Sequence, residues 1–128
     1  MANAAITDVR GHAITAPSAA VAEQLDAIVD DLYYYRPGVI DRLDALLRSA
    51  PELVLGHVLM GYSLLTEGST TAVPKARKRL ERAEALPATP RERLHIAALR
   101  AWVRIVDRRD EVLAPVDETQ QPAFPMGF

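Results

Sequence analysis

The sequence predicts an all-α protein, built from about five short antiparallel helices packed as an α–α superhelix. Its 128 residues fit one ordinary domain, and 49% of them are hydrophobic but only 5% aromatic. Aliphatic side chains must therefore fill the core, and the dominant ones, Ala and Leu, are strong helix formers. Apolar residues also recur at steps of three and four along most of the chain, which is the spacing of one helix face.

Two helices are expected between residues 18 and 50. Ser18 can cap the first helix, and the Arg36-Pro37-Gly38 segment ends it, because proline disfavours helix at the preceding residue. The apolar stripe of the first helix consists of Val21, Leu25, Ile28, Val29 and Leu32. The stripe of the second consists of Val39, Ile40, Leu43, Leu46 and Leu47. Each helix thus has one face to bury.

A third helix, roughly residues 52–66, is apolar almost all round and should be covered on more than one side. Gly56 and Gly61 lie inside it, and each costs the helix about 1 kcal/mol relative to alanine. We therefore expect a neighbouring helix to approach closely there. A fourth helix, about residues 73–86, carries only a thin apolar stripe and is otherwise charged.

A fifth helix, about residues 91–107, can be capped by Thr89, with Pro90 at its first position. It has two apolar faces. One consists of Leu94, Ala97, Ala98, Ala101, Trp102 and Ile105, and the other of Ile96, Leu99, Val103 and Val106. No partner helix is expected after it, because three prolines follow within residues 115–125. A terminal helix of an array buries only one face, so the other needs a cover.

The patch that combines Trp102 with Ile105 or Val106 is too large to leave exposed on a monomer. A second copy of the chain, the chain's own residues 124–128, or a different protein could cover it. The sequence leaves these three alternatives open.

The predicted organisation is an extended lead-in over residues 1–16, a helical-repeat domain over 17–109 and an acidic, Pro-rich tail over 110–128. The chain has no cysteine, which excludes disulfides and thiolate metal sites. No signal peptide is recognisable, and the most apolar stretch, residues 53–65, is shorter than the about 20 residues that span a membrane. These features predict a cytoplasmic protein without membrane contact.

The spacing of Ala76, Leu80, Ala83 and Pro87 matches the second helix of a tetratricopeptide repeat, which makes the predicted superhelix tetratricopeptide-like. Residues 8–112 also resemble the N-terminal part of the tetratricopeptide repeat protein 38 family. The resemblance rests on residues 8–11, on the block APELVLGHV at 50–58, on Gly68 and on the block TPRERLHIAA at 89–98. It implies an α–α superhelix with a role in protein interaction, and it implies no catalytic residues. After about Arg109 the family continues with further repeat helices, where this sequence has its Pro-rich tail.

His57 and His95 lie on apolar helices, one in each of these two blocks. They either line a common pocket or are two separate buried histidines with structural hydrogen bonds, which is the commoner role in helical cores. Glu92 and His95 have the spacing of a di-iron ligand pair, but the second pair and the further glutamates that such a site needs are absent. No metal, cofactor or catalytic residue is predicted.

The fourth helix has a basic face, formed by Lys75, Arg77, Lys78, Arg79 and Arg82. No aromatic residues are interleaved for base stacking, so an anion or nucleic-acid binder through this helix is only a third, less favoured alternative. We expect the basic face to be a solvated helix face whose positive charges complement the negative charges of the first half of the chain. Tyr33, Tyr34 and Tyr35 together span about 200° of a helix, so at least one is exposed. Because tyrosine is enriched at interfaces, Tyr34 is a candidate contact residue.

We therefore expect a protein-interaction module, either scaffold or adaptor, without catalytic activity. Its partner is another protein or a second copy, bound through the fifth helix, with Trp102, Ile105, Val106 and Tyr34 at the interface. The alternative is a small enzyme or ligand-binding protein with a pocket near His57 and His95.

Overall fold

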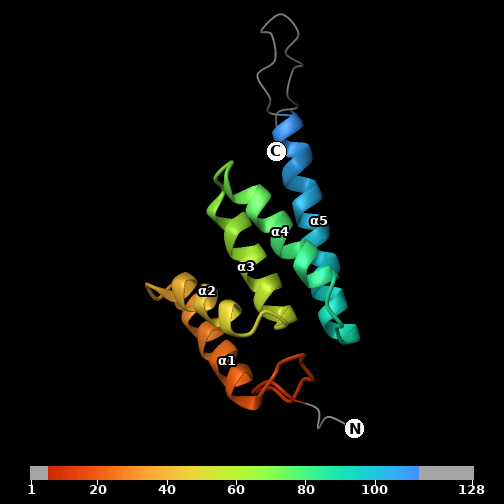
Figure 1. The fold of residues 1–128 in the computed structure, drawn as a ribbon. Helices are drawn as coiled ribbons and strands as arrows, with labels where there is room; N and C mark the ends of the chain where they lie inside the picture. Colours follow the sequence, from red (N-terminus) through yellow and green to blue (C-terminus); the bar gives the residue numbers. More distant parts are fainter. Residues whose placement is uncertain (1–5, 113–128) are drawn as a thin grey trace, which may run out of the picture.

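Five α-helices make up the fold in the computed structural model, which describes residues 6–112 (Figure 1). They are α1 (Ala19–Tyr33), α2 (Val39–Ser49), α3 (Val54–Glu67), α4 (Ala72–Glu84) and α5 (Pro90–Val112). The all-α prediction is confirmed, and within residues 6–112 the only β-pairing is an isolated bridge between Thr7 and Ala13. None of the helices within residues 6–112 is both long and apolar enough to cross a membrane.

Several expected helix ends are confirmed, but α5 continues to Val112, past the expected end near residue 107 and into the predicted tail. The Ser18 hydroxyl accepts a hydrogen bond from the backbone N–H of Val21 at 3.3 Å, which caps α1. Gly38 precedes α2 and Gly68 follows α3, both with a φ of 77°. This left-handed conformation favours glycine, so each of the two residues supports an abrupt change of chain direction.

The core consists of two clusters that meet at α3. The first lies between α1, α2 and α3, and includes Leu25, Ile28, Leu43, Leu46, Leu47, Leu53 and Met60. The second lies between α3, α4 and α5, and includes Val54, Val58, Leu65, Ala76, Leu80, Ile96, Leu99 and Val103. Because α3 contributes to both clusters, it must be apolar on more than one side, as its sequence predicts.

The two glycines inside α3 allow close packing. A Cβ atom built on Gly56 would lie 2.7 Å from Cδ2 of Leu47 in α2, and one built on Gly61 would lie 2.7 Å from Cδ2 of Leu99 in α5. Both distances are far below van der Waals contact. The predicted close approach of neighbouring helices is thus confirmed on two sides of α3.

Residues 6–14 of the expected lead-in form a small hairpin loop. The backbone N–H of Ile14 donates to the Ile6 carbonyl, and that of Asp8 donates to the His12 carbonyl. Oδ1 of Asp8 accepts hydrogen bonds at 2.9 Å from the N–H groups of Arg10 and His12. The carboxylate therefore organises the tip of the loop.

Hydrogen bonds connect this hairpin loop to α1 and α5. In α5, one oxygen of Glu92 accepts from the Thr15 hydroxyl at 2.6 Å and the other from the Thr15 N–H at 2.9 Å. In α1, Asp26 accepts from the N–H of Val9 at 2.9 Å. The loop thus bridges α1 and α5, whose starts both lie toward its side of the molecule in Figure 1.

Candidate functional site

The outer face of α5, opposite the core, carries exposed apolar residues. The core side of α5 carries Ile96, Leu99 and Val103, all at most 5% exposed. On the opposite side Leu94 is 73% and Ile105 is 64% exposed. Ala97, Ala98 and Ala101 are exposed between them. We call Leu94, Ala98, Ala101 and Ile105 the α5 stripe.

The spacing of the α5 stripe is that of a helix-pairing seam. Its four residues follow one another at steps of four, three and four, which keeps them on one line along the helix. Two large side chains, Leu94 and Ile105, flank two alanines. Small residues at the centre let a second helix approach closely, and large ones at the ends can cover its flanks.

Trp102 and Val106 lie beside this face, at the border with the core. Both are half-buried and pack against the second core cluster. The ring centroids of Trp102 and of Tyr62 in α3 lie 5.6 Å apart, and the two ring planes make an angle of 34°. Of the three α5 residues expected at an interface, only Ile105 is therefore classed as exposed. The sequence could not show that Tyr62 would pack against Trp102.

The three tyrosines lie at the α1–α2 turn, on the side of the molecule away from α5 in Figure 1. All three are exposed. The rings of Tyr33 and Tyr34 meet edge to face with centroids 5.2 Å apart, and the Arg36 guanidinium lies over Tyr34 at 5.9 Å. The structure therefore does not bring Tyr34 together with the α5 residues.

His57 is buried between α3, α4 and the α2–α3 connection, and is only 1% exposed. Its Nε2 lies 2.6 Å from the Pro51 carbonyl, to which it donates, and Nη1 of Arg79 donates to its Nδ1 at 3.4 Å. Burial lowers the pKa of His57, the Pro51 carbonyl opposes this, and the charges of Arg79 and Arg82 lower it further. The neutral imidazole thus has structural partners on both nitrogens.

His57 makes stability depend on pH in a defined direction. Its pKa is lowered in the folded protein, so below about pH 6.5 the unfolded chain binds a proton that the folded chain does not. We expect stability to fall as the pH drops from 7.5 to 5.5, and the fall to be smaller in His57→Gln. Urea unfolding at several pH values measures this difference. Equal slopes in the two proteins would contradict the assignment.

His95 lies elsewhere, beside a cavity of about 190 Å³ that α1, α3, α5 and the hairpin loop line. His57 is not part of that lining. The two imidazoles are therefore not brought to one pocket, and the enzyme alternative loses the pair of groups on which it depends.

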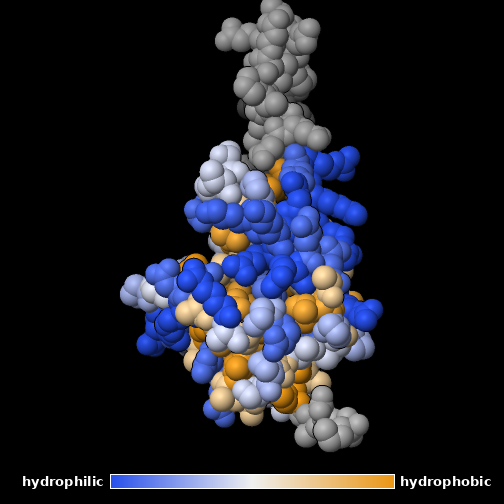
Figure 2. All heavy atoms as spheres, in the orientation of Figure 1, coloured by the Kyte–Doolittle hydropathy of each residue, from blue (hydrophilic) through white to orange (hydrophobic). Residues whose placement is uncertain are grey.

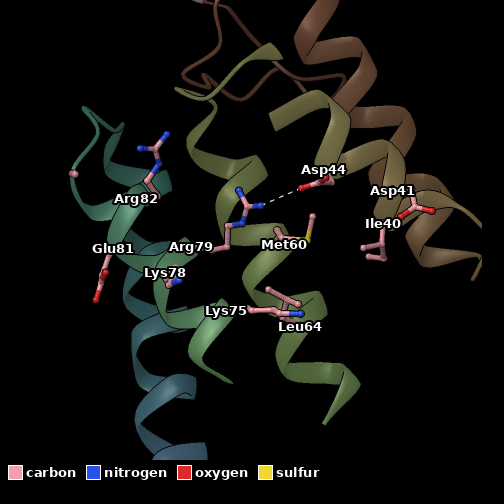
Figure 3. A pocket seen from close by; sticks show the side chains of 11 residues that line it. Ile40, Asp41, Asp44, Met60, Leu64, Lys75, Lys78, Arg79, Glu81 and Arg82 are labelled. Carbon is pink, nitrogen blue, oxygen red and sulfur yellow. Dashed lines mark hydrogen bonds and ion pairs between the residues drawn. The ribbon is translucent and has the colours of Figure 1, made fainter. Parts of the chain in front are cut away.

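A cleft of about 640 Å³ separates α2 from α4 (Figure 3). Met60 and Leu64 of α3 lie along it, Asp41 and Asp44 line its α2 side, and the α4 side is basic. Arg79 reaches across to Asp44, with Nη2 and Oδ1 3.3 Å apart. The basic face of α4 is thus paired with an α2 carboxylate at this point. Figure 2 shows mostly hydrophilic residues over α4 and the upper part of α5.

Glu92 is a buried carboxylate, a feature typical of functional sites, but its hydrogen bonds show a structural role. It is 0% exposed, and its Oε1 accepts from the Thr89 N–H at 2.9 Å while its own N–H donates to the Thr89 hydroxyl at 3.2 Å. This is a capping box, and the predicted Thr89 cap is confirmed. The sequence shows the Thr-x-x-Glu pattern, but the further bonds to Thr15, 77 residues away, leave no local signal.

Among the residues that the structure describes, no three His, Asp or Glu side chains gather as metal ligands would. Comparisons of the chain with protein-family models, with curated proteins and with solved structures find no match.

Proposed function

We propose that this protein is a protein-interaction module of the helical-repeat type, which binds through the outer face of α5. The α5 stripe carries the proposal, because Leu94 and Ile105 are 73% and 64% exposed on the last helix of the described array. In this proposal α1–α2 and α3–α4 are two tetratricopeptide-like pairs, and α5 is the first helix of a third. A helix supplied by another molecule would complete it. The lack of cysteine fits action in the cytoplasm, where thiols stay reduced.

A second copy of the chain is the first partner that the stripe fits. Along the helix the stripe runs large, small, small, large, so it has nearly the same profile in both directions. If two copies pair antiparallel, Leu94 of one meets Ile105 of the other, and Ala98 meets Ala101. A twofold interface requires this kind of self-complementarity.

The mass in solution tests the proposal. We expect the wild-type chain, of 14.0 kDa, to sediment as a dimer at micromolar concentrations. The double variant Leu94→Asp/Ile105→Asp should sediment as a folded monomer, because burying two carboxylates in the seam costs more than the apolar contact contributes. Both positions are exposed in the single chain, so its helical circular dichroism should remain unchanged.

Ile40→Asp is a matched control on α2, where the side chain is 40% exposed beside the α2–α4 cleft. It should leave the dimer intact. A wild-type monomer would contradict the choice of a second copy as partner. A dimer that Ile40→Asp disrupts and the α5 double variant does not would move the interface away from α5.

A further inference from the structure

The cavity under the hairpin loop has an apolar body. Leu25 and Val29 of α1, Val58 and Leu59 of α3 and Ile14 of the hairpin loop line it. Its volume of about 190 Å³ is below the roughly 300–1,000 Å³ of drug-sized sites. A ligand of this cavity is therefore small and has an aliphatic part.

Its rim carries two charges of each sign. Asp8 and Arg10 come from the hairpin loop, Asp26 from α1 and Arg91 from α5. The Asp8 side chain is only 9% exposed. Burial alone would raise its pKa, but hydrogen bonds from His12 and Arg10 and the charges of His12 and Arg91 hold that pKa below its usual value. Asp8 is thus charged at neutral pH, and the formal charges of the four rim residues sum to zero.

One nitrogen on this rim has an ion-pair partner but no hydrogen-bond acceptor among the described residues. Nη1 of Arg91 is buried and makes no hydrogen bond within the part of the chain that the structure describes. The nearest carboxylate oxygen, Oδ2 of Asp8, lies 3.5 Å away, beyond good hydrogen-bond geometry. A buried N–H group without an acceptor is costly, and a guanidinium is the side chain best shaped to hold a carboxylate. The orphaned nitrogen therefore points to a carboxylate ligand.

We infer that this cavity binds a small aliphatic amino acid as a zwitterion, with its carboxylate on Arg91, its ammonium on Asp26 and its side chain on Leu25 and Leu59. The rim is neutral in sum, so a neutral zwitterion leaves no unbalanced charge, whereas a simple carboxylate would add one. Asp26 uses Oδ2 for the Val9 N–H, and within residues 6–108 its Oδ1 makes no hydrogen bond. This site is independent of the proposed function of α5.

Isothermal titration of the full chain with L-leucine tests the inference. Isocaproate, which lacks the amine, and isoamylamine, which lacks the carboxylate, should each bind at least about tenfold more weakly, since each loses one charge-assisted hydrogen bond. Glycine, which lacks the apolar body, should also bind more weakly. Isocaproate that binds as tightly as leucine would overturn the zwitterion assignment, and no heat with leucine at millimolar concentration would overturn the site.

Two variants tie the binding to this cavity. Arg91→Gln should weaken leucine at least about tenfold by removing the charged donor, whereas Arg93→Gln, an exposed arginine two residues further on, should not. Leu59→Phe fills the cavity and keeps all four charges, so it should also abolish binding. If Arg91→Gln unfolds the loop, Leu59→Phe remains the deciding variant, and unchanged affinity in it would overturn the inference.

Discussion

Replacing Glu92 with alanine is expected to lower the free energy of unfolding by about 3 kcal/mol, because the variant leaves several buried donors without an acceptor. The Thr15 N–H, the Thr15 hydroxyl and the Thr89 N–H all bond to this carboxylate. Each unsatisfied buried donor costs about 1–3 kcal/mol, although water can reach half-buried Thr15 and reduce that cost. The start of α5 and the hairpin loop should loosen together.

Urea unfolding measures the loss, and hydrogen exchange locates it. Glu81→Ala on α4 is the matched control, since Glu81 is exposed, and its effect should stay within about 0.5 kcal/mol. Glu92→Gln should fall between the two, because its amide has one oxygen to accept but presents an N–H₂ group where a second acceptor is needed. A loss below 1 kcal/mol in Glu92→Ala would show that the two anchoring bonds contribute little.

Replacing Gly61 with valine is expected to destabilise the fold by about 3 kcal/mol through overpacking against α5. The first added carbon already lies 2.7 Å from Leu99 Cδ2, and Leu99 is 0% exposed, so the leucine has no free space to enter. The α3–α5 contact must open, or Leu99 must leave its rotamer. In a helix exposed to solvent, the same glycine-to-valine substitution would instead stabilise the helix, because glycine has the lower helix propensity.

A double-mutant cycle with Leu99→Ala separates the clash from other effects. Leu99→Ala alone should cost about 2–5 kcal/mol as a cavity mutation. Combined with Gly61→Val, the total loss should be smaller than the sum, because valine occupies part of the vacated space. Ala27→Val at an exposed α1 position controls for β-branching. Additive losses would mean that the two side chains do not compete for space.

The helices could be predicted because their determinants are local. Several determinants act within a few residues and appear in the structure: the apolar stripe of α1, the caps Ser18 and Thr89, and the prolines before α2 and α3. The glycines of α3 predict close approach, but only the structure shows that Leu47 and Leu99 are the neighbours.

The sites could be predicted only in part, because their contacts are distant in sequence. The two apolar faces of α5 are visible from spacing, yet the half-buried state of Trp102 depends on Tyr62. His57 and His95 look alike in sequence, and only the helix packing places one on Pro51 and the other beside a cavity. Nothing local marks residues 6–14 as a loop that α1 and α5 hold. The resemblance to the tetratricopeptide repeat protein 38 family stays a prediction.

Cross-linking between single cysteines tests the central claim, the pairing of α5 with a second α5, most directly. The chain has no cysteine of its own, so Ala98→Cys and Ala101→Cys each introduce the sole thiol. Antiparallel pairing brings position 98 of one copy against position 101 of the other, within the about 4.4–6.8 Å between Cα atoms that a disulfide spans. An equimolar mixture of the two variants should therefore form an intermolecular disulfide faster than either variant alone. No cross-link in the mixture, or one no faster than that of Ala27→Cys on α1, would contradict the pairing.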